Sequence, residues 1–179
     1  MENIVFREFT DDIENYKKLH KWCSQKEVWE WFEQRILSYD EIIEKYQRKL
    51  SLHEEDMYMI AYNKKDIGFT QIYKFVNYMH VIPECQSIME FDIFMDNMFI
   101  DQGKGTEIVK EECKYIFDNY NCDAIILRPF SRNIRAIKCY QKCGFKFIKE
   151  YDGHDTLGNP EKISIFYIKK PWYFFWFWL

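Results

Sequence analysis

The sequence from residue 133 to residue 145 reads Asn133-Ile134-Arg135-Ala136-Ile137-Lys138-Cys139-Tyr140-Gln141-Lys142-Cys143-Gly144-Phe145. Its pattern predicts a helix from Asn133 to Lys142, followed by a strand from Phe145 to Lys149. The run Ala124-Ile125-Ile126-Leu127 just before it is short and apolar, which is typical of a buried strand. This succession of strand, helix and strand predicts a sheet that helices cover.

A second informative stretch is Gln102-Gly103-Lys104-Gly105-Thr106, which lies between a predicted strand (Ser87 to Met95) and a predicted helix (Thr106 to Phe117). Gly103 and Gly105 have no Cβ atom, so the backbone can turn tightly and approach a ligand closely. The unpaired N–H groups at the start of the helix would point at the same spot. The stretch therefore predicts an anion site of the kind that binds a pyrophosphate.

The rest of the chain supplies strands first and helices between them, and contains no repeat or Pro/Gly-rich linker. The pattern predicts a strand at Ile4 to Phe9, followed by a helix capped by Asp11 or Asp12. A helical stretch with Val28, Trp29 and Phe32 follows, and then a helix from Tyr39 to Leu50 that Ser38 begins. Met57 to Tyr62 and Ile67 to Tyr73 read as a hairpin, and Ile163 to Ile168 as the last strand. We therefore predict one domain over residues 1–179 with an α/β (α+β) fold, in which helices flank a mixed central β-sheet.

Composition narrows the classes of function. The net charge of -4 argues against a nucleic-acid partner, because binding phosphates requires a basic face. The six cysteines form no C-x-x-C pair and no histidine completes a zinc set, so we expect no metal. The start of the chain carries no signal peptide, which predicts a cytoplasmic protein. The aromatic tail, residues 171–179, is too short to span a bilayer, and packing on the domain, a homodimer contact and a membrane-surface contact all stay open for it.

The stretch from Asn133 to Phe145 resembles the N-x-x-A-x-x-x-Y-x-x-x-G-F pattern of GNAT-superfamily N-acetyltransferases. Within that superfamily the chain is similar to the aminoglycoside 6'-N-acetyltransferases. The similar segments are Ile67-Gly68-Phe69-Thr70-Gln71-Ile72-Tyr73, Glu90-Phe91-Asp92, Gly103-Lys104-Gly105-Thr106 and Asn133 through Phe145. The resemblance covers roughly residues 28–150 and implies a GNAT fold with acetyl-CoA as the co-substrate.

The resemblance also implies roles for single residues. The loop from Gln102 to Thr106, with Gly103, Lys104 and Gly105, would hold the acetyl-CoA pyrophosphate, and Asn133 would bind the pantetheine arm. Tyr140 would protonate the departing thiolate. Asp92 would bind the acceptor amine and remove its proton, with Glu90 as an aid. This chemistry suits the residue types, because a carboxylate attracts an ammonium and can accept its proton, and a phenol can donate one.

Two positions depart from the pattern of the family. Ile100 stands where Gln or Arg often precedes the glycine loop. Arg128-Pro129 stands where the aminoglycoside enzymes usually carry Asp-Pro, whose carboxylate helps to bind the cationic drug. A fixed cation there removes an attraction and adds a repulsion, so Arg128 is expected to weaken the binding of a polycationic sugar.

Other interpretations stay open at this stage. Tyr140 can be a core aromatic residue, and Asp92 can lie on a solvated strand face. Trp29, Trp31 and Phe32 can either line the substrate entrance or pack in the core. The leading hypothesis is acetylation of the 6'-amine of an aminoglycoside; the alternatives are a GNAT enzyme for a protein N-terminus or a small metabolite amine, and a non-catalytic acyl-CoA-binding regulator.

Overall fold

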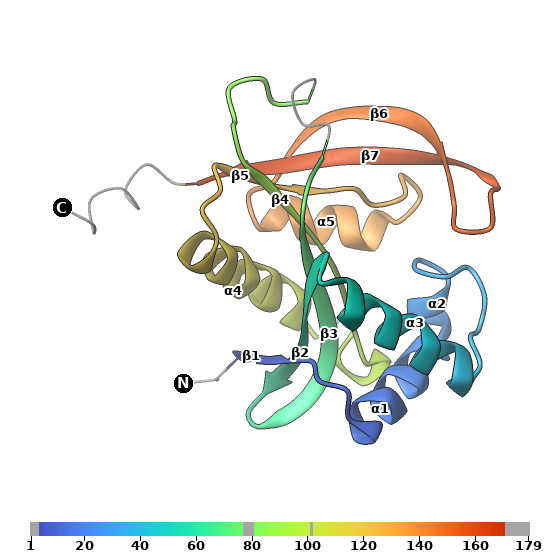
Figure 1. The fold of residues 1–179 in the computed structure, drawn as a ribbon. Helices are drawn as coiled ribbons and strands as arrows, with labels where there is room; N and C mark the ends of the chain where they lie inside the picture. The colour runs from blue at the N-terminus through green and yellow to red at the C-terminus, as the bar shows by residue number, and fades with distance from the viewer. Residues whose placement is uncertain (1–3, 77–80, 101, 171–179) are drawn as a thin grey trace.

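A computed structural model describes residues 4–76, 81–100 and 102–170; the predicted aromatic tail lies outside the described residues. Seven strands form one mixed sheet in the order β1-β2-β3-β4-β5-β7-β6 (Figure 1). Their bounds are β1 Ile4–Glu8, β2 Glu55–Tyr62, β3 Lys65–Lys74, β4 Ile88–Met95, β5 Ala124–Leu127, β6 Lys146–His154 and β7 Pro160–Lys169. The prediction of a mixed α/β sheet is confirmed.

Five helices connect these strands: α1 Ile13–Cys23, α2 Lys26–Trp29, α3 Tyr39–Leu52, α4 Lys104–Asn119 and α5 Ile134–Lys142. The predicted caps are present: the Asp12 side chain accepts the Glu14 N–H, and Ser38 forms a capping box with Glu41. The helix predicted around Val28 is a single turn that ends at Trp29, so Phe32 lies beyond it. Within the described ranges, no helix is both long and apolar enough to cross a membrane.

The direction of the strands changes within the sheet. Strands β1 to β4 pair in antiparallel fashion, as do β5, β7 and β6. Only β4 and β5 are parallel, and their register covers Ile88 to Glu90 on β4 and Ala124 to Ile126 on β5. Because β4 continues to Met95, its second half has no partner on the β5 side in this register.

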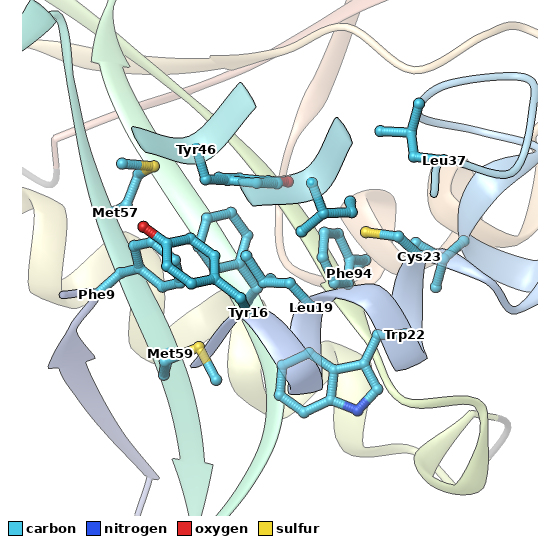
Figure 2. Close-up of a cluster of buried hydrophobic side chains, with 13 residues drawn as sticks. Phe9, Tyr16, Leu19, Trp22, Cys23, Leu37, Tyr46, Met57, Met59 and Phe94 are labelled. Atoms are coloured by element: carbon cyan, nitrogen blue, oxygen red, sulfur yellow. The ribbon is translucent and has the colours of Figure 1, made fainter. Parts of the chain in front are cut away.

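The core lies on both faces of the sheet. On one face, side chains from α1 and α3 pack against β2, β3 and β4, as Figure 2 shows for Tyr16, Leu19, Tyr46, Met57 and Phe94. On the other face, α4 and α5 pack against β3, β4, β5 and β7. The alternation of side chains along a strand sends neighbouring residues of β3 and β4 to these two different layers.

Phe69 is the centre of the first layer, because its ring contacts Phe9, Tyr46 and Phe94 at centroid distances of 5.5, 5.3 and 5.5 Å. We expect Phe69→Ala to lower the free energy of unfolding by about 3–5 kcal/mol, since it leaves a cavity in a packed core. Denaturant titration measures the change. Val76→Ala, at a residue 72% exposed, is the matched control and should change stability by less than about 0.5 kcal/mol. An equal effect of the two substitutions would contradict this account of the core.

Candidate active site

A cleft of about 710 Å³ opens where β4 and β5 stop pairing. In open α/β sheets, ligands bind beyond the carboxyl ends of strands at a point where the connections diverge, and this cleft has that location. Most of the site residues predicted from the sequence line it: Glu90, Asp92, Gly103, Gly105, Thr106, Arg128, Asn133 and Tyr140. The cleft thus joins residues from β4, the start of α4, the end of β5 and α5.

One wall of the cleft is the beginning of α4. Gly103 precedes the helix with a φ of 77°, a left-handed conformation that favours glycine, and no side chain caps the first turn. Gly105 and Thr106 line the cleft there, while the side chains of Gln102 and Lys104 bond elsewhere: Gln102 donates to the Met98 carbonyl at 2.5 Å. Lys104 likewise donates to a phenol outside the loop. Gln102 and Lys104, which the sequence also predicted for the loop, are not among the residues that line the cleft.

Asp92 lies on the opposite wall, where two donors orient its carboxylate. Gln71 Nε2 and Tyr73 Oη donate to Asp92 Oδ2 at 2.9 and 3.1 Å. Lys49 Nζ donates to Gln71 Oε1 at 2.9 Å, which fixes the Gln71 amide with its NH2 group toward Asp92. Both donors bond the same oxygen, and none of the described residues donates to Oδ1. Oδ1 is thus the oxygen that is available to an ammonium group.

Arg128 has an ion-pair partner in the cleft. Its Nε lies 2.7 Å from Glu90 Oε1, and its guanidinium lies over the Phe75 ring at 5.4 Å. Glu90 is 2% exposed, and burial raises its pKa to about 7 although Arg128 opposes the shift. The positive charge that the sequence places at position 128 is therefore compensated by the carboxylate two residues before Asp92.

Two predicted residues lie on α5. The Tyr140 side chain lines the cleft and packs against the ring of Phe145, with a centroid distance of 5.9 Å. Burial raises the pKa of Tyr140, so its phenol keeps its proton near neutral pH. Asn133 Oδ1 accepts the Ala136 N–H at 3.1 Å and caps α5. This capping role leaves the side-chain NH2 of Asn133 as the group that a ligand can bind.

Charged residues of both signs line the cleft. Arg135, Lys138 and Lys142 line it from α5, and Glu27 lines it together with Trp31 and Phe32. The predicted entrance residue Trp29 is absent from the lining. Cations suit phosphates, whereas carboxylates suit an ammonium. The described residues contain no His, Cys, Asp and Glu group that could hold a metal ion.

Sequence reasoning missed the residues that orient Asp92. Gln71 lies directly opposite Asp92 in the β3–β4 register, and Tyr73 lies on the same face two residues later. The alternation along β3 indicates that Gln71 and Tyr73 share a face, but only the register shows that this face is the one carrying Asp92. Lys49 comes from a helix distant in sequence, and no local signal indicates it.

The chain belongs to the GNAT acetyltransferase family, because a sequence model of the acetyltransferase (GNAT) domain matches residues 11–153. Among curated relatives it is similar to the spermine/spermidine N(1)-acetyltransferase of Bacillus subtilis (strain 168), at 35% identity over 78 residues. That match covers 41% of this chain and 48% of the relative, so the chain spans about half the length of that relative. A match to the spermidine N(1)-acetyltransferase of Vibrio cholerae has 28% identity and covers 64% of this chain and 63% of the relative.

Solved structures share the fold. Aminoglycoside acetyltransferase AAC(6')-Ib in complex with coenzyme A and kanamycin has a TM-score of 0.71 at 21% identity and covers 91% of this chain and 94% of that one. Spermidine N-acetyltransferase from Vibrio cholerae in complex with CoA and spermine has a TM-score of 0.74 at 18% identity and covers 93% and 95%. Both structures hold a coenzyme A molecule together with an amine.

The buried Glu90 carboxyl predicts a pH dependence of stability. Its pKa in the folded chain, about 7, is above its ordinary value of 4.5, so the folded state binds this proton more tightly than the unfolded state. The stability difference between the parent and Glu90→Gln should therefore fall as pH rises from about 4.5 to about 7. Denaturant titrations across this range measure it, with the exposed Glu111→Gln as control. A difference that stays flat or rises would contradict the buried environment of Glu90.

Proposed function

We propose that this protein is an acetyl-CoA-dependent N-acetyltransferase in which the acceptor amine attacks the thioester directly. One observation carries the proposal: Asp92 and Tyr140 line the same cleft as the uncapped start of α4. A proton acceptor, a proton donor and an anion site are thus present together. The family that the chain belongs to supports the same reaction.

The proposed chemistry uses the geometry of Asp92. The acceptor enters as an ammonium, which the Asp92 Oδ1 attracts and from which it takes a proton. Gln71 and Tyr73 donate hydrogen bonds to Oδ2, so the carboxylate keeps one orientation while Oδ1 accepts the proton from the ammonium. Tyr140 gives its proton to the departing thiolate, and its phenolate regains a proton when the nitrogen loses its second proton as the amide forms. No covalent enzyme intermediate is needed, because the amine itself attacks the acetyl carbon.

The proposed acetyl-CoA site extends along α4 and α5. The pyrophosphate would accept hydrogen bonds from the backbone at Gly103, Gly105 and Thr106, since the first turn of α4 has no side-chain cap. The cations on α5 would neutralise phosphate charge. Asn133 would bind the pantetheine arm through the NH2 group that the helix cap leaves unused.

For the acceptor, we propose a small amine that carries positive charge, first of all the 6'-amine of an aminoglycoside. The similar segments around Gln71, Asp92 and Tyr140 support this choice. Arg128 weighs less against it than its charge alone suggests, because Glu90 pairs with it and leaves Asp92 to act on the ammonium. The negative charge of Glu90 offsets this repulsion to the extent that Glu90 is ionised, and its pKa of about 7 makes the offset depend on pH.

A polyamine is the second candidate. It is supported by the similarity of the chain to the spermine/spermidine N(1)-acetyltransferase of Bacillus subtilis. A linear polyamine presents the same primary ammonium to Asp92 as an amino sugar does. The two acceptors differ in width, and both Arg128 and Trp31 are among the residues that line the cleft in which the acceptor would bind.

The acceptor class is tested by thiol release from acetyl-CoA with kanamycin, neomycin, spermidine, spermine and an N-terminally free peptide, and by mass spectrometry of each product. We expect one added acetyl group on an aminoglycoside. Asp92→Asn should lower kcat/KM by roughly 100-fold or more, because the charge and the base are both lost. Asp40→Asn, at an exposed aspartate outside the cleft, is the matched control. Acetylation of spermidine or the peptide alone would contradict the aminoglycoside proposal, and no thiol release with any amine would contradict the enzyme itself.

Tyr140→Phe tests the proposed acid separately from binding. Removing the hydroxyl keeps the ring and its packing on Phe145, so the affinity for acetyl-CoA in calorimetry should stay close to that of the parent. Turnover should fall by roughly 100-fold, as for the loss of one positioned proton donor. Tyr167→Phe, which removes a hydroxyl outside the cleft, is the matched control and should leave turnover close to that of the parent. Unchanged turnover would assign the proton donation to another group.

A further inference from the structure

A buried carboxyl group that the proposed chemistry does not use lies behind Asp92. Glu112 is a residue of α4 with 0% exposure, among the apolar side chains that face the sheet. Its Oε1 contacts the hydroxyl of Thr70, and its Oε2 has no hydrogen-bond partner in the described part of the chain. Thr70 is itself 0% exposed and lies on β3 next to Gln71.

The Thr70 hydroxyl connects Glu112 to Asp92. Thr70 Oγ1 lies 3.0 Å from the backbone carbonyl oxygen of Asp92 as well as in contact with Glu112 Oε1. A hydroxyl has one proton to donate, and a carbonyl oxygen can only accept. Both contacts are hydrogen bonds at the same time only if Thr70 donates to Asp92 and Glu112 donates to Thr70. Glu112 can donate only when its carboxyl group carries a proton.

The surroundings of Glu112 point the same way. No cation pairs with it among the described residues, and an unpaired carboxylate in a dry interior is too costly to keep its charge. Burial raises the pKa of Glu112 well above its ordinary value, and the Thr70 contact opposes this only in part. The negative charge of Asp92 adds to the rise. A buried carboxylic acid kept neutral at neutral pH can then serve as a hydrogen-bond donor.

We propose that Glu112 is a neutral carboxylic acid that positions Asp92 through the hydroxyl of Thr70. The role rests on the proposed function of Asp92 as the base, whereas the protonation of Glu112 does not. The chain Glu112–Thr70–Asp92 holds the β4 backbone just past Glu90, where the pairing with β5 has ended.

The neutral state matters for the reaction as well as for the geometry. A second carboxylate behind the strand would place a like charge close to Asp92, and two negative charges in a buried site repel each other strongly. It would also disfavour the negative charge that Tyr140 gains when it gives its proton away. Glu112 as a neutral acid leaves Asp92 as the charged group on this part of β4 and still supplies the hydrogen bond.

Infrared spectroscopy tests the protonation directly and requires no acceptor. Glu90 is also buried with a raised pKa, so the measurement uses Glu90→Gln as its background. The spectrum of Glu90→Gln at neutral pH should contain the carbonyl band of a buried carboxylic acid, which disappears when Glu112→Gln is added and stays when Glu111→Gln is added. Glu111 is the exposed neighbour of Glu112 on α4, so its substitution removes a carboxylate without touching the buried chain. Absence of the band in Glu90→Gln, or its persistence when Glu112→Gln is added, would overturn the proposal.

Kinetics and isotope-edited spectra test the positioning. Glu112→Gln keeps a neutral donor for Thr70, so kcat and the acidic limb of the pH–rate profile should stay within about twofold of the parent. Thr70→Val removes the hydroxyl at nearly constant shape and should lower kcat by roughly tenfold with little change in the KM for acetyl-CoA. Glu112→Leu removes the donor and should lower kcat about as much as Thr70→Val does; combining these two substitutions should cause little further loss, because the two residues act in one chain.

An infrared spectrum of the protein with an isotope-labelled Asp92 backbone carbonyl reports the hydrogen bond from Thr70 to that carbonyl, and it requires no turnover. Its stretching band should move to higher frequency in Thr70→Val, because the carbonyl loses a hydrogen bond. If the acidic limb of the pH–rate profile moves to lower pH in Glu112→Gln, Glu112 is charged in the parent. If Thr70→Val keeps full activity and the Asp92 carbonyl band does not move, Thr70 does not position Asp92. Either result overturns the proposal. If Asp92→Asn keeps full turnover while the acid band and the carbonyl shift are found, the proposed role of Asp92 fails and the neutral Glu112 chain stands.

Discussion

The parallel pairing of β4 with β5 ends at Glu90, and the candidate site depends on that end. As long as two strands pair, their backbone groups bond each other and no ligand can enter between them. Where the pairing stops while β4 continues to Met95, backbone and side chains from both strands become available to a cleft. The two helices that follow β4 and β5 in sequence, α4 and α5, supply further walls, together with the segment around Glu27 to Phe32.

Three carboxyl groups lie around this cleft, and their surroundings differ so that Asp92 is the one available to bind an ammonium. Glu90 is compensated by Arg128, and Glu112 makes its contact with Thr70 as the proposed neutral acid. Asp92 instead accepts two hydrogen bonds on one oxygen from neutral donors. Three carboxyl groups close together would repel one another if all were charged. Pairing one and protonating another is a way to keep the third charged.

The packing layers explain how strand β4 serves both the core and the site. Phe94 points into the layer of α1 and α3, and Phe91 into the layer of α4. Asp92 shares the face of Phe94 and of Gln71, where Lys49 from α3 reaches the Gln71 amide. The aromatic core beneath is what holds α3 against β3 and keeps this contact in place. Stability of that layer and orientation of the base are therefore linked.

The sequence by itself determined the order of the strands and helices, the caps of α1 and α3, and the family, because these depend on local pattern and on a long motif from Asn133 to Phe145. It also indicated Asp92, Tyr140 and the glycine loop as separate candidates. Only the tertiary structure decided that they share a cleft, that Arg128 is paired with Glu90, and that Gln71 faces Asp92. These facts depend on strand register and on contacts between distant segments, and no local pattern of residues specifies either of them.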